Sequence, residues 1–175
     1  FAQSVEEVCA LAGQTPDAGG VSVLPALHGL GTPHNNPTAS VAVWGRSATT
    51  TAAHLARAVL EGVALRMAEI VDLAVTHHPI DPTTALPVDG GLTRSDAFCQ
   101  ILADLLARPV TRLHQVEATA WGAARAGAQG VGVEIADSTD FCQRFNPTLT
   151  PTEARQRLHQ WQAQTLNFSQ KKDKS

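Results

Sequence analysis

The chain lacks the features that mark several classes of protein. It has 175 residues and only three cysteines, which lie far apart and form no C-x-x-C pair: Cys9, Cys99 and Cys142. An odd number of widely spaced cysteines argues against a disulfide framework and against a structural zinc site. We therefore expect reduced cysteines in a cytoplasmic protein.

Long apolar runs and basic clusters are also missing. The most apolar stretch, residues 55–75, is interrupted by charged residues and predicts no membrane span. The chain opens with Glu6 and Glu7 rather than with a basic segment, so no signal peptide is predicted. The formal net charge is -3, without a clustered basic face, which excludes a nucleic-acid footprint.

Methionine is nearly absent. The single methionine is Met67, and the chain starts at Phe1. We therefore expect a fragment whose N-terminal portion is missing.

The residues that are present describe a globular domain. Hydrophobic residues make up 43% and charged residues 17% of the chain. This composition is typical of a globular protein and not of a disordered or fibrous one. Periodicity predicts strands at 21–27, 41–44, 85–89 and 110–113, and helices at 1–12, 52–75, about 93–107, 119–128 and about 150–166. Strands that alternate with helices indicate an α/β domain with helices packed against a partial sheet. The predicted domain covers 1–167, residues 133–149 are irregular, and 168–175 form a disordered tail.

Three helix starts are predicted from side chains that can cap them. Thr49, Thr50 and Thr51 offer hydroxyls before the helix at 52–75. Thr93 with Asp96 reads as an acidic variant of the capping box. Thr150, Pro151 and Glu153 form a complete capping box with proline at the first helical position.

The most informative motif is Asp89-Gly90-Gly91, which joins a predicted strand to a predicted helix. Two glycines at this point let a ligand approach bare backbone, and the N–H groups of the helix start favour an anion such as phosphate. An ordinary tight turn is the alternative. The chain contains neither G-x-G-x-x-G nor G-x-x-x-x-G-K-[ST], which disfavours a dinucleotide-binding Rossmann module and a P-loop.

Other candidate sites are weaker. The segment 28–33, His-Gly-Leu-Gly-Thr-Pro, could bind a ligand but reads more simply as a connecting loop. The seven histidines show no metal-ligand spacing, so no metal site is predicted. Glu61 and Glu69 share a helix face and could act as general bases, although pairing with Arg57 and Arg66 is the simpler interpretation.

Four segments, taken in order, resemble the FGGY family of carbohydrate kinases, and glycerol kinase most of all. They are VLPALHGLGTPHNNPTA (23–39), HLARAVLEGVALRMAEIV (54–71), VDGGLTRSDAFCQILADLLARPV (88–110) and VEATAWGAARAG (116–127). The second segment, with Gly45 before it, matches the family's C-terminal signature at His54, Leu55, Ala58 and Glu61. The matches span residues 23 to about 130 and keep the family's order and spacing.

The resemblance implies a ribonuclease-H-like, actin-type ATPase fold and transfer of the γ-phosphoryl group of ATP, with Mg²⁺, to a sugar or polyol hydroxyl. It implies adenosine contacts at Gly91 and at Ser95, where the family has Asn, with Gly90 and Asp89 shaping the turn. His34-Asn35-Asn36 replaces the family's Tyr-Trp-Asp, and Ser40 replaces an Arg, which leaves the substrate open.

The family's phosphate loop, polyol-binding residues and aspartate base all lie upstream of the matched region. We therefore expect no catalytic residue in this chain, a missing N-terminal kinase domain as its partner, and no phosphorylation by the chain alone. The alternative is a kinase-like scaffold or interaction domain that has lost catalysis. Homo-oligomerisation is possible, and the sequence does not identify the sugar or polyol.

Overall fold

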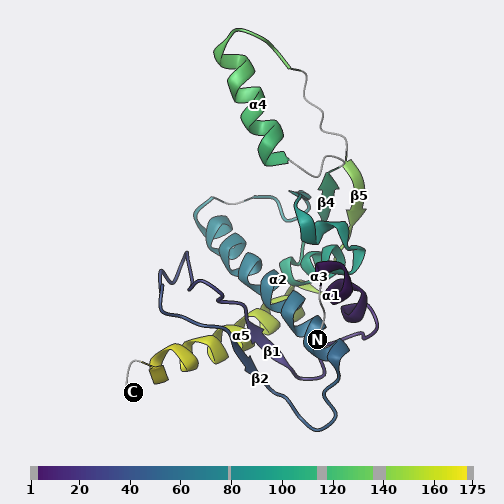
Figure 1. The fold of residues 1–175 in the computed structure, drawn as a ribbon, viewed down its shortest axis with the longest axis vertical. Helices are drawn as coiled ribbons and strands as arrows, with labels where there is room; N and C mark the ends of the chain where they lie inside the picture. The colour runs from purple at the N-terminus through teal and green to yellow at the C-terminus, as the bar shows by residue number, and fades with distance from the viewer. Residues whose placement is uncertain (1–3, 79, 114–117, 136–140, 173–175) are drawn as a thin grey trace.

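The computed structural model describes residues 4–78, 80–113, 118–135 and 141–172. Its helices are α1 (Val5–Ala12), α2 (Ala52–His77), α3 (Asp96–Leu106), α4 (Ala118–Gly130) and α5 (Pro151–Lys172), with a 3-10 turn, η1, at Gly91–Arg94. Its strands are β1 (Ser22–Leu24), β2 (Ala42–Trp44), β3 (Leu86–Val88), β4 (Val110–Leu113) and β5 (Phe141–Phe145). Figure 1 shows α2 crossing the middle of the body, with α4 standing apart from it.

The strands form two small sheets. β1 and β2 pair antiparallel, and the second sheet has the order β3-β4-β5. In that second sheet β3 runs parallel to β4, whereas β5 runs antiparallel to it. The predicted mixed sheet with helices against it is therefore confirmed, in two pieces.

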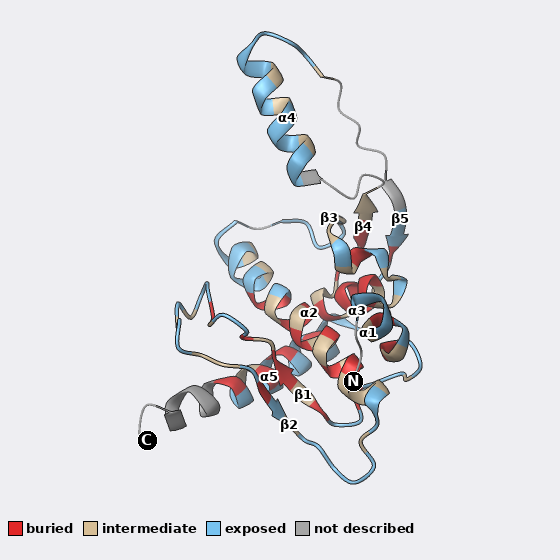
Figure 2. Cartoon of the chain, viewed as in Figure 1, coloured by how far each residue is buried: buried red, intermediate tan, exposed pale blue. Residues whose placement is uncertain are grey.

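Helix α2 is the element on which the others pack. It contacts α1, α3, α5 and β1, and its small residues keep it slim enough to be covered on more than one side. Gly62 marks the closest approach, because a Cβ there would lie 2.5 Å from the backbone oxygen of Val23 in β1. Figure 2 shows the buried residues concentrated along α2, α3 and β1. The largest fully buried side chains include Leu24, Leu60, Phe98, Ile101, Leu102 and Val110.

Two predicted caps are confirmed, and one is wrong. The Thr51 hydroxyl accepts from the backbone N–H of His54 at 3.3 Å, and Glu153 accepts from the backbone N–H of Thr150 at 2.8 Å. Thr93, however, belongs to the 3-10 turn, and Ser95 caps α3 by accepting from the backbone N–H of Phe98 at 3.3 Å. A 3-10 turn therefore precedes α3, and the N-cap of this helix is Ser95 rather than Thr93.

Two further boundaries differ from the predictions. Residues 133–149, expected to be irregular, contain β5, whose backbone pairs with β4. Helix α5 continues to Lys172, beyond the expected end near Leu166, so residues 168–172 of the expected disordered tail are helical. Residues 1–3 of the first predicted helix and 173–175 of the tail lie outside the described residues.

A buried carboxylate ties the loop at 28–40 to the body. Glu69 on α2 is only 6% exposed and forms an ion pair with Arg66. Its Oε1 atom also lies 3.0 Å from Nε2 of His34 in the loop and accepts from the amide of Gln162 on α5 at 3.1 Å. Arg66 in turn donates to the backbone oxygen of Thr32 at 2.8 Å. Glu69 is thus a structural anchor, as the pairing interpretation predicted.

We expect Gly62→Ala to lower the free energy of unfolding by about 3 kcal/mol, because the added methyl group pushes α2 away from β1. Gly122→Ala on α4 is the matched control. A Cβ there meets no atom within 4 Å, so the helix should gain about 0.5–1 kcal/mol from the better helix former. Urea denaturation measures both variants, and equal stability of the two would contradict the close approach of α2 to β1.

We expect Glu69→Leu to destabilise the fold by about 3 kcal/mol, since Arg66 and His34 would lose the carboxylate that they share. Glu61→Leu on the same helix serves as the control. Among the described residues, Glu61 pairs with Arg57 alone, at 2.8 Å, and its loss should cost less than about 1 kcal/mol. Thermal unfolding followed by circular dichroism compares the two, and a smaller effect at Glu69 than at Glu61 would be inconsistent with the anchor.

Candidate functional site

The Asp89-Gly90-Gly91 turn lies where the sequence predicted it, between β3 and the helical segment that follows. Gly90 adopts φ 105° and ψ 173°, a backbone conformation that side chains disfavour. The Thr93 hydroxyl donates to the backbone oxygen of Gly90 at 2.8 Å, and the Thr93 N–H donates to the same oxygen at 3.1 Å. Gly90 is therefore required by the shape of the turn.

Gly91 has a different reason to be glycine. Its φ is not in the left-handed region, and a Cβ at Gly91 would meet no atom within 4 Å. The fold of this chain would accommodate a side chain there without a clash. The space above the Gly91 backbone is open, so a side chain would project into it.

That open space is part of a cavity of about 260 Å³. One wall comes from the turn and the start of α3, and the other from α1. The lining residues are Val5, Glu6, Cys9, Ala10, Gly91, Arg94 and Ser95. The structure therefore places two of the three predicted site residues, Gly91 and Ser95, on one cavity, whereas Gly90 is not among its lining residues.

Ser95 makes a contact that the sequence did not predict. Its hydroxyl caps α3 by accepting from Phe98, so its oxygen already has one donor when it faces the cavity. A hydroxyl has two acceptor lone pairs and one proton to donate, so Ser95 keeps the capacity for a further hydrogen bond to a ligand.

Arg112 on β4 holds the turn from behind, and sequence reasoning missed it. Its Nη1 atom donates to the backbone oxygens of Thr93 and Arg94 at 3.1 and 3.3 Å, and to the Asp96 carboxylate at 2.8 Å. Its Nη2 atom donates to Oε1 of Gln143 on β5 at 2.6 Å. A charged residue within a four-residue strand that is otherwise mostly apolar was the one available signal.

Cys99 supports the same turn from the core. Its thiol donates to the backbone oxygen of Thr93 at 3.3 Å. Burial is the main cause that raises the pKa of this thiol to about 11. Cys99 therefore stays protonated and keeps its donor near neutral pH, which makes it a structural group in the wall of the site.

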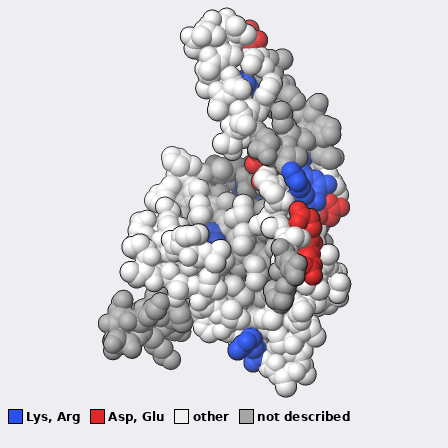
Figure 3. All heavy atoms as spheres, in the orientation of Figure 1, with Lys and Arg blue, Asp and Glu red and all other residues white. Residues whose placement is uncertain are grey.

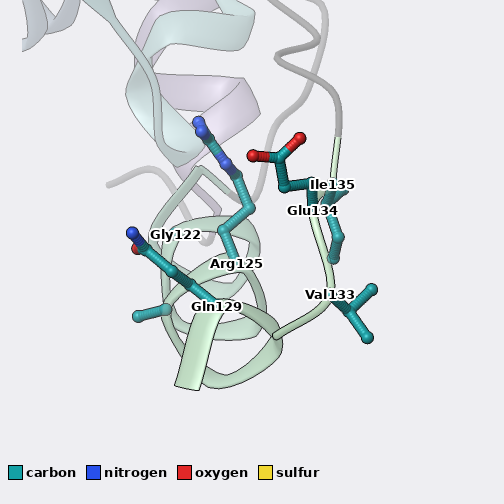
Figure 4. A pocket seen from close by; sticks show the side chains of 7 residues that line it. Gly122, Arg125, Gln129, Val133, Glu134 and Ile135 are labelled. Atoms are coloured by element: carbon teal, nitrogen blue, oxygen red, sulfur yellow. The ribbon is translucent and has the colours of Figure 1, made fainter. Parts of the chain in front are cut away.

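A larger cavity, of about 690 Å³, lies beside α4 rather than beside the turn. Figure 4 shows Arg125 and Gln129 on the helix, with Glu134 and Val133 on the strand-like segment opposite. Residues 119–130 of α4 include no buried residue, and the helix stands away from the body (Figure 1). No predicted site residue lines this cavity, so its size alone does not make it the functional site.

The loop at 28–40 behaves as a connecting loop. Leu30 and Asn36 exchange two backbone hydrogen bonds of 2.8 Å, and a Cβ at Gly29 would lie 2.8 Å from the backbone of Pro37. Its first glycine is thus packed against its own chain, unlike Gly91. This loop supports the fold and offers no open backbone at that position.

Within 4–78, 80–113, 118–135 and 141–172, no group of three or more His, Cys, Asp or Glu residues is arranged to hold a metal ion. No helix among them has the length and apolarity needed to cross a bilayer.

Known proteins that are similar to this chain include members of the family that its motifs resemble. Residues 2–131 match the model of the FGGY family of carbohydrate kinases, C-terminal domain. Glycerol kinase of Methylibium petroleiphilum is 41% identical over 165 residues, which cover 89% of this chain and 33% of that protein. Glycerol kinase of Thermus brockianus is 48% identical over 149 residues, covering 85% of this chain and 28% of that protein.

Solved structures of kinases are also similar to this chain. The crystal structure of Plasmodium falciparum glycerol kinase with ADP superposes with a TM-score of 0.79 at 25% identity, covering 95% of this chain and 34% of that one. Xylulose kinase from Rhodospirillum rubrum gives a TM-score of 0.72 at 31% identity, covering 94% and 33%. The chain thus spans about a third of the length of these relatives and has part of their actin-type ATPase fold. It belongs to the FGGY family of carbohydrate kinases, as a C-terminal domain of that family.

Proposed function

We propose that this chain is the nucleotide-binding part of an ATP-dependent kinase that phosphorylates a sugar or polyol hydroxyl. The observation that carries the proposal is the open backbone at Gly91, which lines a cavity and needs no glycine for the fold itself. A glycine that the chain does not require supports a role in admitting a ligand. The solved Plasmodium falciparum relative is described with ADP, which favours a nucleotide as that ligand.

The chain supplies the adenosine side of such a site and not the chemistry. Gly91 and Ser95 would contact the adenosine, and Gly90 would fix the turn. The cavity lining contains a single carboxylate, Glu6, and the described residues hold no metal cluster. Phosphoryl transfer depends on positioning and on cations that neutralise the moving charge. These parts would come from a partner domain equivalent to the remainder of the longer relatives.

We expect Gly91→Val to abolish binding of ATP and ADP, because the isopropyl group would project into the cavity. The fold should keep its stability, since a Cβ at this position meets no neighbour. Isothermal titration calorimetry of the wild-type chain and the variant measures the affinity. Gly31→Val, at a glycine outside the cavity lining where a Cβ also meets no atom within 4 Å and φ is not left-handed, controls for a general effect of replacing glycine. Equal nucleotide affinity of wild type and Gly91→Val would remove Gly91 from the site.

We also expect no turnover when the 175-residue chain is incubated with ATP, Mg²⁺ and glycerol or a pentulose. The physical reason is that binding the adenosine does not position the γ-phosphoryl group. Formation of ADP, followed by a coupled assay, is the measurement. A rate comparable to that of a complete glycerol kinase would show that the chain contains the catalytic groups that we assign to another domain.

A non-catalytic scaffold is the second candidate function, and the separate position of α4 favours it. None of residues 119–130 is buried (Figure 2), so this small-residue helix is available to a partner. A scaffold would not need an open cavity at Gly91, so nucleotide binding by the chain distinguishes the two candidates.

A further inference from the structure

Arg108 is a buried cation without a carboxylate partner. It directly follows the C-cap of α3, and only 5% of the residue is exposed. Arg57, Arg66 and Arg112 each form an ion pair with a carboxylate, whereas Arg108 forms none with any residue that the structure describes. Because removing a charge from water is costly unless an opposite charge compensates it, this position favours an anion beside the guanidinium.

The guanidinium of Arg108 is also poorly hydrogen-bonded. A guanidinium carries five N–H donors. Among the described residues, its one hydrogen bond joins Nη2 to the backbone oxygen of Ile80 at 3.5 Å, which is at the long end of the range for such bonds. Nη1 is buried and donates to no atom of the chain. The fold therefore leaves most of these donors without an acceptor and restrains the guanidinium only weakly.

Two carboxylates near Arg108 do not supply the missing partner. Asp81, in the loop after α2, is exposed and accepts from the N–H and the hydroxyl of Thr83 at 2.8 and 2.7 Å. These two bonds are the main reason that the pKa of Asp81 lies below its ordinary value, and the charge of Arg108 contributes least to that shift. Asp72 on α2 is exposed and forms no ion pair with a described residue.

Arg108 lines a cavity of about 110 Å³ between three helices. The walls come from the C-terminal half of α2, the end of α3 and the start of α5, and the charged residues of the lining are Asp72, Arg108 and Arg155. Two cations and one carboxylate leave a positive excess. Since a water molecule takes up about 30 Å³ in the liquid, the cavity has room for a small ion and is too small for a nucleotide.

The start of α5 adds to the positive potential of this cavity. Pro151 and Ala154 belong to the lining, so the first turn of the helix, which carries a partial positive charge, lies at the cavity wall. Glu153 in the same turn is not a lining residue, and its carboxylate already accepts from the N–H and the hydroxyl of Thr150 at 2.8 and 2.7 Å. The helix end and the two arginines therefore favour the same kind of ligand.

The acidic side chains over α1 lie at the other end of α3. Figure 3 shows them next to basic side chains over the turn before α3, and the first turn of α1 contains Glu6 and Glu7. Helix α3 has 11 residues, which separates its two ends by about 16 Å. Because salt screens exposed charges beyond about 8 Å, these carboxylates repel an anion at Arg108 only weakly. The same distance separates the cavity at Arg108 from the one at Gly91.

We propose that Arg108, together with Arg155 and the first turn of α5, forms a binding site for a small oxyanion of the size of phosphate. The anion supplies both the negative charge and the acceptors that the buried guanidinium lacks, and charge-assisted bonds of this kind are strong. Rotation of the guanidinium away from the Ile80 oxygen brings Nη1 to the anion. The ligand would join α2, α3 and α5 at a place apart from the nucleotide cavity, so this inference does not depend on the proposed function.

The test uses inorganic phosphate, sulfate and chloride as sodium salts at equal ionic strength. We expect phosphate and sulfate, but not chloride, to raise the melting temperature of the wild-type chain, since a ligand that binds only the folded state stabilises it. Arg108→Met should fold and melt at or above the wild-type temperature without phosphate, because it removes a buried unpaired charge and keeps the volume. Its phosphate affinity, measured by isothermal titration calorimetry, should fall at least about tenfold.

Two further variants test the charges of the lining. Asp72→Asn should raise the affinity for phosphate, because it removes a carboxylate that repels the anion, and Arg155→Met should lower it. Arg46→Met, at an exposed arginine outside the lining, is the matched control and should bind phosphate like the wild type. A purely structural role of Arg108 would not make phosphate affinity depend on Asp72 and Arg155 in opposite directions.

The opposing outcomes are distinct. Equal effects of phosphate on the wild type and on Arg108→Met, or an equal effect of chloride, would overturn the site. If Arg108→Met and Asp81→Asn both lower the melting temperature in phosphate-free buffer, Asp81 is the partner of Arg108 and the inference is wrong. Gly91→Val should leave phosphate affinity unchanged, so failure of nucleotide binding and failure of the anion site are separate results.

Discussion

The contact between Gly62 of α2 and the backbone of Val23 in β1 is the constraint on which the body depends. A Cβ at Gly62 would lie 2.5 Å from the Val23 oxygen, so only glycine allows this helix to lie so close to the strand. Because α2 sits that close, α5 can also reach β1, where the Trp161 indole N–H donates to the same Val23 oxygen at 2.9 Å. Helices α1 and α3 then pack on the other sides of α2, and together they place the walls of the cavity.

The candidate site is built on that body by a second set of contacts centred on Arg112. One guanidinium holds the carbonyl oxygens of Thr93 and Arg94 as well as the Asp96 carboxylate. Charge-assisted hydrogen bonds of this kind are stronger than neutral ones, so the turn keeps its shape while Gly91 stays uncovered. Contacts with β4 and the core keep the turn rigid. The cavity beside it stays open because Gly91 has no side chain. A ligand that binds there would meet a wall that is already ordered.

Much of the architecture could be predicted because it depends on local sequence patterns. Periodicity placed α2, and the hydroxyl and carboxylate of Thr150 and Glu153 marked the start of α5. The glycine pair located the turn for the same reason, since glycine is needed where the backbone is left-handed or must remain uncovered. By contrast, β5 was missed because its pairing with β4 spans about thirty residues of sequence and leaves no local signal. The 3-10 turn, which moved the cap of α3 from Thr93 to Ser95, is likewise too short to have a period.

The amino-acid sequence by itself determined the family, the order of the elements other than β5 and the 3-10 turn, and the position of the glycine turn, because each depends on residues that are neighbours along the chain. Only the tertiary structure decided that α1 faces Gly91 and that Arg112 holds the turn. Those relations join residues that are many positions apart, and they exist only once α2 has brought their elements together. The physical reason is that the free energies of capping and turn formation depend on residues close in sequence. A cavity, in contrast, forms between surfaces that tertiary packing places opposite each other.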